Sequence, residues 1–218
     1  MKTKKELPVI ALVLLPFGYL AMIWNQLPQQ VPMHFNLQGE VDRYGDRTEL
    51  LSIPFLLPFL TYVIFLVVPY IDPKKQIQKM GSKYQSLKFS LTGIMSLLAL
   101  YILYSAKNQS LASGNLVFLV IGLLYLVLGN YFKTIKPNYF IGIRTPWTLE
   151  SESVWKQTHG WAGKLWFVGG LLVIICSLLL EENRNFQAFM AITLILAVVP
   201  MGHSYLLHRK EKESDPSD

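Results

Sequence analysis

The stretch Lys136-Pro-Asn-Tyr-Phe-Ile-Gly-Ile-Arg-Thr-Pro-Trp-Thr148 lies between two strongly apolar segments of this 218-residue chain. Proline disfavours helical backbone in the residue before it, so Pro137 and Pro146 predict a shaped loop here rather than a continuous helix. The rest of the chain has the composition of a membrane scaffold that presents this loop. A turn that merely joins two helices explains the same composition.

Three side chains in and after this stretch suit contacts at a membrane surface. The guanidinium of Arg144 offers a planar fork of donors. We expect it to bond a carbonyl oxygen, a carboxylate such as Glu150 or Glu152, or a lipid phosphate. The rings of Trp147 and Trp155 are amphipathic and suit the boundary between lipid and water.

Uncharged, mostly apolar runs make up much of the chain, and short polar loops separate them. Hydrophobic residues are 52% and charged residues 16% of the sequence, and the mean hydropathy is +0.34. Crossing a bilayer core takes about 20 apolar residues, and the helices of a soluble protein would show charged faces that these runs lack. The sequence therefore predicts an all-α membrane protein with six transmembrane helices. The runs are Leu7–Gln26, Leu50–Ile71, Phe89–Ala106, Leu111–Phe132, Leu165–Leu180 and Phe186–Leu207.

The basic residues are distributed unevenly between the two sides of the predicted membrane. With a cytoplasmic amino terminus, all but Arg43, Arg47, Lys107 and Arg184 of the 20 lysines and arginines fall on the inner side. The positive-inside rule therefore predicts that both termini are cytoplasmic. In this setting anionic membrane lipids are the expected partner of the basic loops, and direct binding of nucleic acid is not expected.

The loop 27–49 is expected on the outer face, as a short extended piece from Val31 to Asn36 and a turn through Gln38 and Gly39. Its candidate functional residues are Pro32, His34, Asn36, Gly39 and Asp42. His34, Asp42 and Asp46 are metal-ligating types, but their spacing matches no standard ligand pattern, so no metal is expected. The single cysteine likewise excludes a disulfide framework and a thiolate metal site.

On the inner side, Thr148 is expected to cap a helix that begins after it. Trp155, His159 and Ala162 recur there at helical spacing, which predicts a short interfacial helix over Leu149–Lys164 before the fifth transmembrane helix. His159 is expected to be a surface or capping residue rather than a catalytic base.

Two features of the transmembrane helices predict their packing. Pro54 and Pro58 predict a kink in the second helix. Gly122 and Gly129 are seven residues apart on nearly the same face of the fourth helix, which indicates close packing against a neighbour.

Three regions follow from these assignments. Residues 1–72 form an N-terminal two-helix unit with the outer loop, and residues 73–208 form a four-helix core with the inner motif loop 133–164. The charged tail 209–218 is expected to be disordered.

The run Asn138-Tyr-Phe-Ile-Gly-Ile-Arg-Thr-Pro-Trp-Thr-Leu-Glu-Ser-Glu-Ser-Val-Trp155 resembles the signature of the SdpI family, which are bacterial multi-pass membrane proteins. Leu27-Pro-x-x-Val-Pro-Met-His-Phe-Asn-x-x-Gly39 is similar to the small uncharacterised domain that often precedes the SdpI core. At 159–161 the chain reads His-Gly-Trp, where the family often has a basic residue. The positions that match the motif are Asn138, Gly142, Arg144, Thr145, Pro146, Trp147, Thr148 and Trp155.

The resemblance implies an immunity protein of the bacterial plasma membrane, without enzymatic activity or a cofactor. The named family member protects against a secreted peptide toxin and holds a small repressor at the membrane. A secreted peptide toxin on the outer face and a cytoplasmic repressor at the inner loops are therefore the implied partners.

Two other classes of function fit the residues less well. A small-molecule or lipid transporter or channel is one, but ion-coupled transport usually needs charged groups within the membrane, and the apolar runs contain none. A membrane-edge enzyme using Arg144, His159 and Glu150 or Glu152 is the other, but no spacing of a nucleophile and a base is recognisable.

Overall fold

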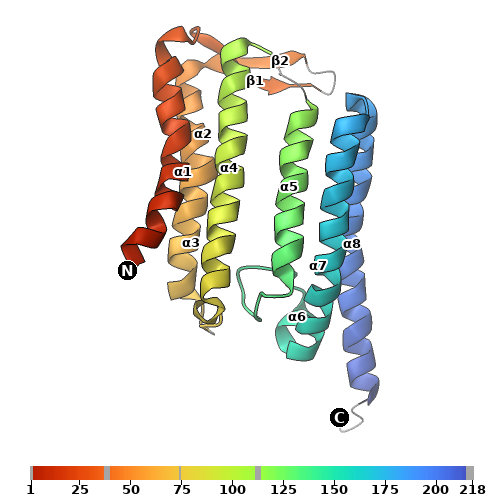
Figure 1. Ribbon diagram of the computed structural model, residues 1–218. Helices are drawn as coiled ribbons and strands as arrows, with labels where there is room; N and C mark the ends of the chain where they lie inside the picture. Colours follow the sequence, from red (N-terminus) through yellow and green to blue (C-terminus); the bar gives the residue numbers. More distant parts are fainter. Residues whose placement is uncertain (1, 37–39, 74, 111–113, 215–218) are drawn as a thin grey trace.

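A computed structural model describes residues 2–36, 40–73, 75–110 and 114–214 of the chain. Within this part, six helical segments are long and apolar enough to cross a membrane, as the sequence predicts. They run side by side as one elongated bundle, with a small β-hairpin at one end and the inner motif loop at the other (Figure 1). The chain is therefore an all-α multi-pass protein of the cell membrane, apart from that hairpin.

The helices follow one another in the order of the apolar runs. Their bounds are α1 (Lys2–Ile23), α2 (Ser52–Pro54), α3 (Leu60–Ile71), α4 (Ser82–Asn108), α5 (Asn115–Phe132), α6 (Pro146–Glu150), α7 (Glu152–Leu179) and α8 (Glu182–Ser214). Shorter helical turns are η1 (Trp24–Gln26), η2 (Arg47–Leu51), η3 (Phe55–Phe59) and η4 (Gln78–Met80).

The second transmembrane helix is built from η2, α2, η3 and α3, which run on from one another. The turn η3 is π-helical and contains Pro58, with Pro54 just before it. Proline has no amide hydrogen to donate, so two prolines four residues apart disturb the regular ladder, and a π-helical turn takes up the irregularity. The irregularity lies where the sequence predicts a kink.

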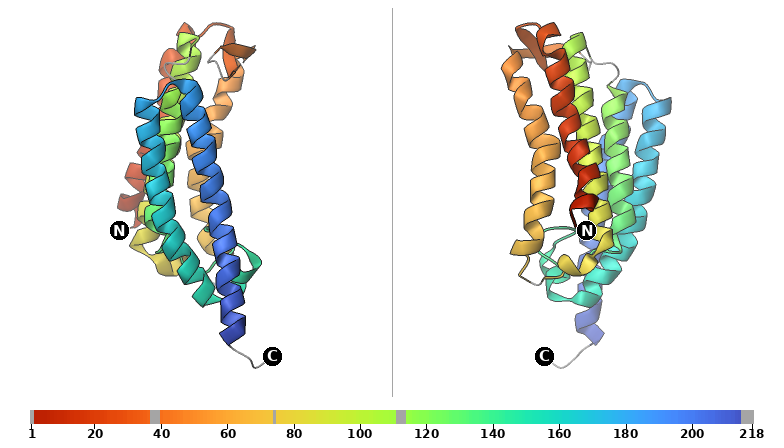
Figure 2. Two further views of the ribbon diagram at one scale, coloured as in Figure 1. Left: turned by 90° about the vertical axis from the view of Figure 1, so that its right-hand side faces the viewer. Right: turned by 60° about the vertical axis from the view of Figure 1, so that its left-hand side comes forward.

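The bundle consists of two groups of helices. The helices α1, α3 and α4 pack together on one side, and α5, α7 and α8 pack together on the other, with α4 and α5 meeting between them (Figures 1 and 2). The contact of α5 with α7 is the most extensive in the molecule, and that of α4 with α5 is much smaller. We call the boundary between the two groups the seam.

The β-hairpin caps the end of the bundle that is expected to face outward (Figure 1). Its strands are β1 (Gln30–Phe35) and β2 (Val41–Asp46), paired antiparallel with Val31 opposite Gly45. Val31 is fully buried in the apolar cluster beneath it. The predicted extended piece is thus present, and β2 is an addition to it, while the predicted turn at Gln38 and Gly39 lies outside the described residues.

Close backbone contact joins α5 to α7. A Cβ atom on Gly129 would collide with the backbone of Phe167 and of Gly163, and one on Gly122 would lie about 3 Å from the carbonyl oxygen of Gly170. Glycine is therefore required at these crossing points. The predicted role of Gly122 and Gly129 in helix packing is confirmed.

The structure corrects the prediction of a separate interfacial helix over Leu149–Lys164. This segment is mostly the first half of α7, which continues without a break to Leu179. It contains no proline, and its Gly163 is held against α5, so nothing interrupts the helix. A short helix does precede α7, but it is α6, which ends where Ser151 adopts extended backbone.

The charged segments also differ from the sequence-based expectation. The helix α8 continues to Ser214, so the residues from Arg209 to Ser214 are helical rather than disordered, and an i,i+4 pair of Arg209 with Glu213 supports them at 2.8 Å. An ion pair also joins two of the candidate spans, because Lys88 of α4 lies 2.6 Å from Glu6 of α1.

Candidate functional site

The inner motif loop leaves α5 as an irregular segment, residues 133–145, which we call the α5–α6 loop. Asn138 holds its first half in shape and is itself 1% exposed. Its side-chain oxygen accepts hydrogen bonds from the amides of Phe140 and Ile141, both at 2.8 Å, and its amide nitrogen donates to the carbonyl oxygens of Lys136 and Ile141. Four bonds from one buried side chain replace the backbone pairing that an irregular loop lacks.

The second half of the loop rests on His159 of α7. The amide of Ile143 donates to Nε2 of His159 at 2.9 Å, and Nδ1 donates to the carbonyl oxygen of Trp155 at 2.9 Å. A ring that accepts at one nitrogen and donates at the other is the neutral imidazole. His159 is 1% exposed, so the expectation of a surface or capping residue is wrong.

Gly142 allows the loop to approach this ring. Its φ of +113° is outside the range that side-chain-bearing residues adopt readily, and a Cβ atom there would collide with Nε2 of His159. Trp155 forms the other side of the same contact, with its ring stacked on His159 at a centroid separation of 4.0 Å. Its indole nitrogen donates to the carbonyl oxygen of Ile135 at 2.8 Å, which ties the loop to α7 a second time.

Arg144 lies on the exposed face of the loop. Its Nη1 donates to the carbonyl oxygen of Tyr139 at 2.7 Å. Of the expected partners, the backbone carbonyl is therefore the one found, while Glu152 pairs instead with Lys156 at 2.9 Å. The exposed guanidinium is placed where a lipid phosphate or another protein can reach it.

The segment Thr145–Thr148 fastens the loop to α6 and to α8. Thr145 is the N-cap of α6, Pro146 is its first residue, and Thr148 completes a reciprocal capping box with Thr145. The prediction that Thr148 is an N-cap is therefore corrected, because Thr145 caps α6 and Ser151 caps α7.

Ser204 of α8 is the partner that sequence reasoning misses. It is fully buried and lies 3.2 Å from the hydroxyl of Thr145, and the indole nitrogen of Trp147 donates to it at 2.5 Å. Further along α8, the carboxylate of Glu211 accepts a hydrogen bond from Ser151 at 2.9 Å. A serine within an apolar helix was the only signal in the sequence, and its partner is 57 positions away.

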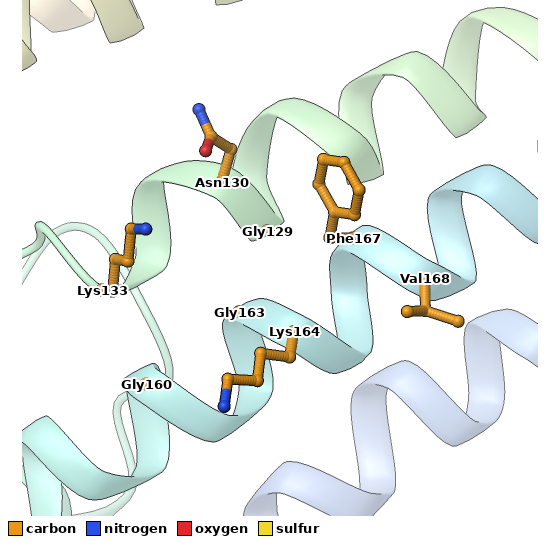
Figure 3. Close-up of a pocket in the computed structure, with 8 residues that line it drawn as sticks. All are labelled: Gly129, Asn130, Lys133, Gly160, Gly163, Lys164, Phe167 and Val168. Atoms are coloured by element: carbon orange, nitrogen blue, oxygen red, sulfur yellow. The ribbon is translucent and has the colours of Figure 1, made fainter.

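A groove runs along the α5–α7 contact beside this loop (Figure 3). Its volume is about 340 Å³, and its floor contains Gly129 and Gly163. Lys133 and Lys164 stand on facing helices at its rim, with Phe167 along the apolar part (Figure 3). Basic side chains over an apolar groove at the inner end of the bundle suit an anionic lipid.

A second cavity, the inner cavity, lies across the seam and is walled by the α5–α6 loop. It has a volume of about 420 Å³, and the loop contributes the four residues from Phe140 to Ile143. The opposite wall is apolar and comes from α3 and α4, including Phe65 and Tyr84. The α5–α6 loop therefore lies between an apolar space at the seam and the end of the bundle that is expected to face the cytoplasm.

The predicted outer residues are partly brought together. His34 and Asp42 face each other across the hairpin at 2.6 Å, and the side chains of Asn36 and Glu40 bond at 3.0 Å. Pro32 is buried in β1, and Gly39 lies outside the described residues. Among the described residues no group of three metal-ligating side chains occurs.

The geometry of the loop suits positioning and docking. Both nitrogens of His159 are used in hydrogen bonds that shape the backbone, and Thr145, Thr148 and Ser204 bond one another in a buried cluster. The exposed residues of the loop, Lys133, Lys136, Tyr139 and Arg144, are presented on a backbone that these hydrogen bonds hold.

Comparison with known proteins agrees with the resemblance seen in the motif. The SdpI/YfhL protein family matches residues 134–204, and a domain of unknown function, DUF1648, matches residues 11–57. The immunity protein SdpI of Bacillus subtilis (strain 168) is 27% identical over 95% of this chain and 97% of its own length. An uncharacterised protein of Archaeoglobus fulgidus is 38% identical over 30% of this chain and 36% of its own length.

No solved structure matches the chain significantly. The SdpI/YfhL match begins within the α5–α6 loop and ends at Ser204, so it contains both sides of the buried contact between the loop and α8. The chain therefore carries the SdpI/YfhL family segment at residues 134–204, and it is similar to the immunity protein SdpI along nearly its whole length.

Proposed function

We propose that this chain is an immunity protein of the cell membrane that gives resistance to a secreted peptide toxin. The observation that carries the proposal is the similarity to an immunity protein over 95% of the chain, with both family segments in place. A fragmentary match would support only a shared motif, whereas this one includes the outer hairpin as well as the inner loop.

The proposal places toxin contact on the hairpin side and a readout on the loop side. With both termini cytoplasmic, the hairpin faces the outside, where a secreted peptide arrives. The inner motif loop then presents Arg144 and Tyr139 to the cytoplasm, where a small repressor is the proposed partner. The loop is anchored on α7 and α8 and also walls the inner cavity at the seam, so a shift of the seam would alter its surface.

Protection from toxin tests the proposal. A sensitive strain expressing the chain is challenged with the purified secreted peptide toxin of Bacillus subtilis strain 168, and the concentration that halves growth is compared with that of the empty strain. The wild-type chain should raise this concentration at least tenfold. Wild-type chain in the membrane without any gain in resistance would contradict the proposed function.

Arg144 provides the first variant. Arg144→Ala removes an exposed guanidinium that donates to the carbonyl oxygen of Tyr139, so membrane abundance should be unchanged while protection falls. Arg144→Lys should not restore protection, because lysine offers a point charge instead of a planar fork. A fully protective Arg144→Lys chain would exclude the guanidinium from this role.

Lys156→Ala is the matched control for Arg144. This lysine is also exposed at the inner side, and its pair is the exposed Glu152. Its loss should leave protection unchanged, since surface pairs contribute little. The repressor is tested by asking whether a cytoplasmic DNA-binding protein sediments with membranes that carry the wild-type chain and not with those that carry Arg144→Ala.

A further inference from the structure

A third cavity, the outer cavity, lies at the opposite end of the seam from the α5–α6 loop. It has a volume of about 410 Å³ and is enclosed by the hairpin strand β1 and the outer ends of α4, α5 and α8. This volume lies in the range of small-ligand sites, about 300–1,000 Å³. The cavity also accepts an aromatic or branched aliphatic side chain of a larger ligand.

The walls of the outer cavity are mostly apolar. Phe35 of β1, Tyr101 of α4, Val117 and Phe118 of α5, and Phe186 of α8 contribute to its lining. Because both helix groups and the hairpin supply walls, an occupant would contact all three at once. The cavity is thus shaped by the assembled molecule rather than by any single element.

A buried hydroxyl without a partner lines this apolar space. Ser105 of α4 is 2% exposed, and its Oγ atom has no hydrogen-bond partner among the described residues. Leaving a buried polar atom unsatisfied costs about 1–3 kcal/mol. A ligand that brings a hydrogen-bonding group into the cavity would satisfy this hydroxyl.

Carboxylates surround the cavity's polar rim. Glu182 lines the cavity directly and accepts a bond from the amide of Gly114 at 2.9 Å. His34 and Asn36 also lie at the rim. His34 is hydrogen-bonded to the carboxylate of Asp42, and Asn36 donates a hydrogen bond to the carboxylate of Glu40. An apolar cavity with an acidic rim is complementary to a cationic, partly apolar ligand.

We propose that the outer cavity receives an apolar side chain of a cationic secreted peptide, whose basic residues lie against the Glu40, Asp42 and Glu182 carboxylates. This inference rests on the proposed immunity function and names its binding site. In the expected orientation the peptide reaches the cavity from outside without crossing the membrane. Ser105 forms one hydrogen bond with the peptide backbone next to the inserted side chain.

Filling the cavity tests the proposal. Val117→Trp adds bulk from the cavity wall, while Leu116→Trp adds the same bulk at the neighbouring position of α5, which is 41% exposed and does not line the cavity. Both chains are placed in phosphatidylcholine nanodiscs. Binding of a fluorescent synthetic peptide of alternating leucine and lysine is measured by anisotropy, with empty nanodiscs as the background.

The wild-type chain and Leu116→Trp should bind the peptide saturably and alike, and Val117→Trp should bind it at least about tenfold more weakly, as for loss of a buried anchor. A leucine–glutamate peptide should bind more weakly than the leucine–lysine peptide. Equal binding by Val117→Trp, or equal binding of the acidic peptide, would overturn the assignment of the cavity.

The protection assay separates this inference from the proposed function. If the wild-type chain protects cells and Val117→Trp protects equally well, the cavity is not the site, and the immunity function stands. If the wild-type chain binds the basic peptide through the cavity but protects no cells, the immunity function fails, and the cavity stands as a peptide site. Ser105→Ala should also weaken peptide binding, since it removes the hydroxyl and adds no bulk.

Discussion

The α5–α6 loop can approach His159 because Gly142 has no side chain. With φ at +113° and the imidazole directly opposite, neither the backbone nor the space admits a Cβ atom. The bond from the Ile143 amide to the ring depends on this approach. One residue without a side chain therefore positions the loop that presents Arg144.

Gly142→Ala should release this part of the loop. Backbone strain of this kind costs about 1–3 kcal/mol, so hydrogen-exchange protection of the Ile143 amide should fall about tenfold or more. Mass spectrometry of exchange in detergent would measure it on peptides that contain residues 138–148. Gly18→Ala is the control, because a Cβ atom there meets no other atom within 4 Å. Unchanged protection in Gly142→Ala would contradict the role given to this contact.

The sequence allowed the motif residues to be named, but their partners could not be read from it. Asn138 was identified by its place in the motif, while its four bonds depend on how the loop folds back. Thr148 looks like a helix cap because it precedes two glutamates, yet Pro146 moves the helix start earlier and makes Thr145 the cap. Ser204 gave no signal because its role depends on α8 packing beside α6.

At the scale of elements, glycines allow α5 and α7 to pack with their backbones in direct contact. Gly129 and Gly163 place the two backbones in direct contact near the inner end, and Gly122 and Gly170 repeat this nearer the outer end. Two crossing points along one pair of helices fix both their separation and their rotation.

Gly129→Val should separate this pair. Its side chain would collide with the backbone of Phe167 and Gly163, which cannot move aside as a flexible side chain does. We expect the apparent melting temperature in detergent to fall by several degrees, as for overpacking that costs about 1–3 kcal/mol. Gly160→Ala lies in α7 with nothing within 4 Å of the added Cβ atom and should melt like the wild-type chain. If Gly129→Val melted at the same temperature as the wild-type chain, the contact between α5 and α7 would not be as tight as described.

The ion pair of Glu6 with Lys88 connects α1 to α4 near the inner end of the first helix group. Both carboxylate oxygens of Glu6 accept from Lys88, at 2.6 and 2.7 Å, and the hydroxyl of Tyr62 donates to the same carboxylate at 3.2 Å. The lysine side chain is 2% exposed and the glutamate side chain 23% exposed. The pair is therefore largely enclosed by the protein.

Lys88→Met should destabilise the chain by about 2 kcal/mol, because it leaves a partly buried carboxylate without its cation. The double variant Glu6→Gln with Lys88→Met should recover most of the loss, since both charges are then removed. Unfolding of the purified protein in mixed detergent would measure both. If the double variant were no more stable than Lys88→Met, the loss would come from packing rather than from the unpaired charge.

The length of the elements was predictable to different degrees. The spans follow from apolar length alone, since lipid leaves a chain few alternatives to a helix of about 20 residues. The break expected between the interfacial segment and the fifth span does not exist, because amphipathic residues at 152–164 bury their apolar side against α5 and the loop instead of lying on lipid.

At the scale of the molecule, the arrangement of six helices into two groups was outside the reach of sequence patterns. Apolar residues face lipid and protein alike in a membrane, so periodicity does not tell which helices are neighbours. Only the glycines of α5 indicated a close partner, and they did not name α7. The outer and inner cavities lie where α4 meets α5, in a contact less extensive than that of α1 with α4 or of α5 with α7.

The seam contains a cavity at each end, and α4 contributes to the walls of both. A peptide that fills the outer cavity would change the spacing of α4 from α5, and the opposite wall of the inner cavity belongs to the same α4 and to α3. If the chain signals as proposed, movement of one group against the other would be its two-state element.

The glycine contacts of α5 with α7 limit what the inner loop can detect. Residues 133–145 begin at the end of α5 and are fastened to α7 and α8, so all their attachments belong to the group of α5, α7 and α8. A loop that is attached only to one group of helices keeps the same end-to-end distance when the two groups move relative to each other. Binding of a peptide on the outer side would therefore affect this loop through the α3–α4 wall of the inner cavity. A cytoplasmic partner would then detect a change in the shape of the loop surface rather than in the length of the loop.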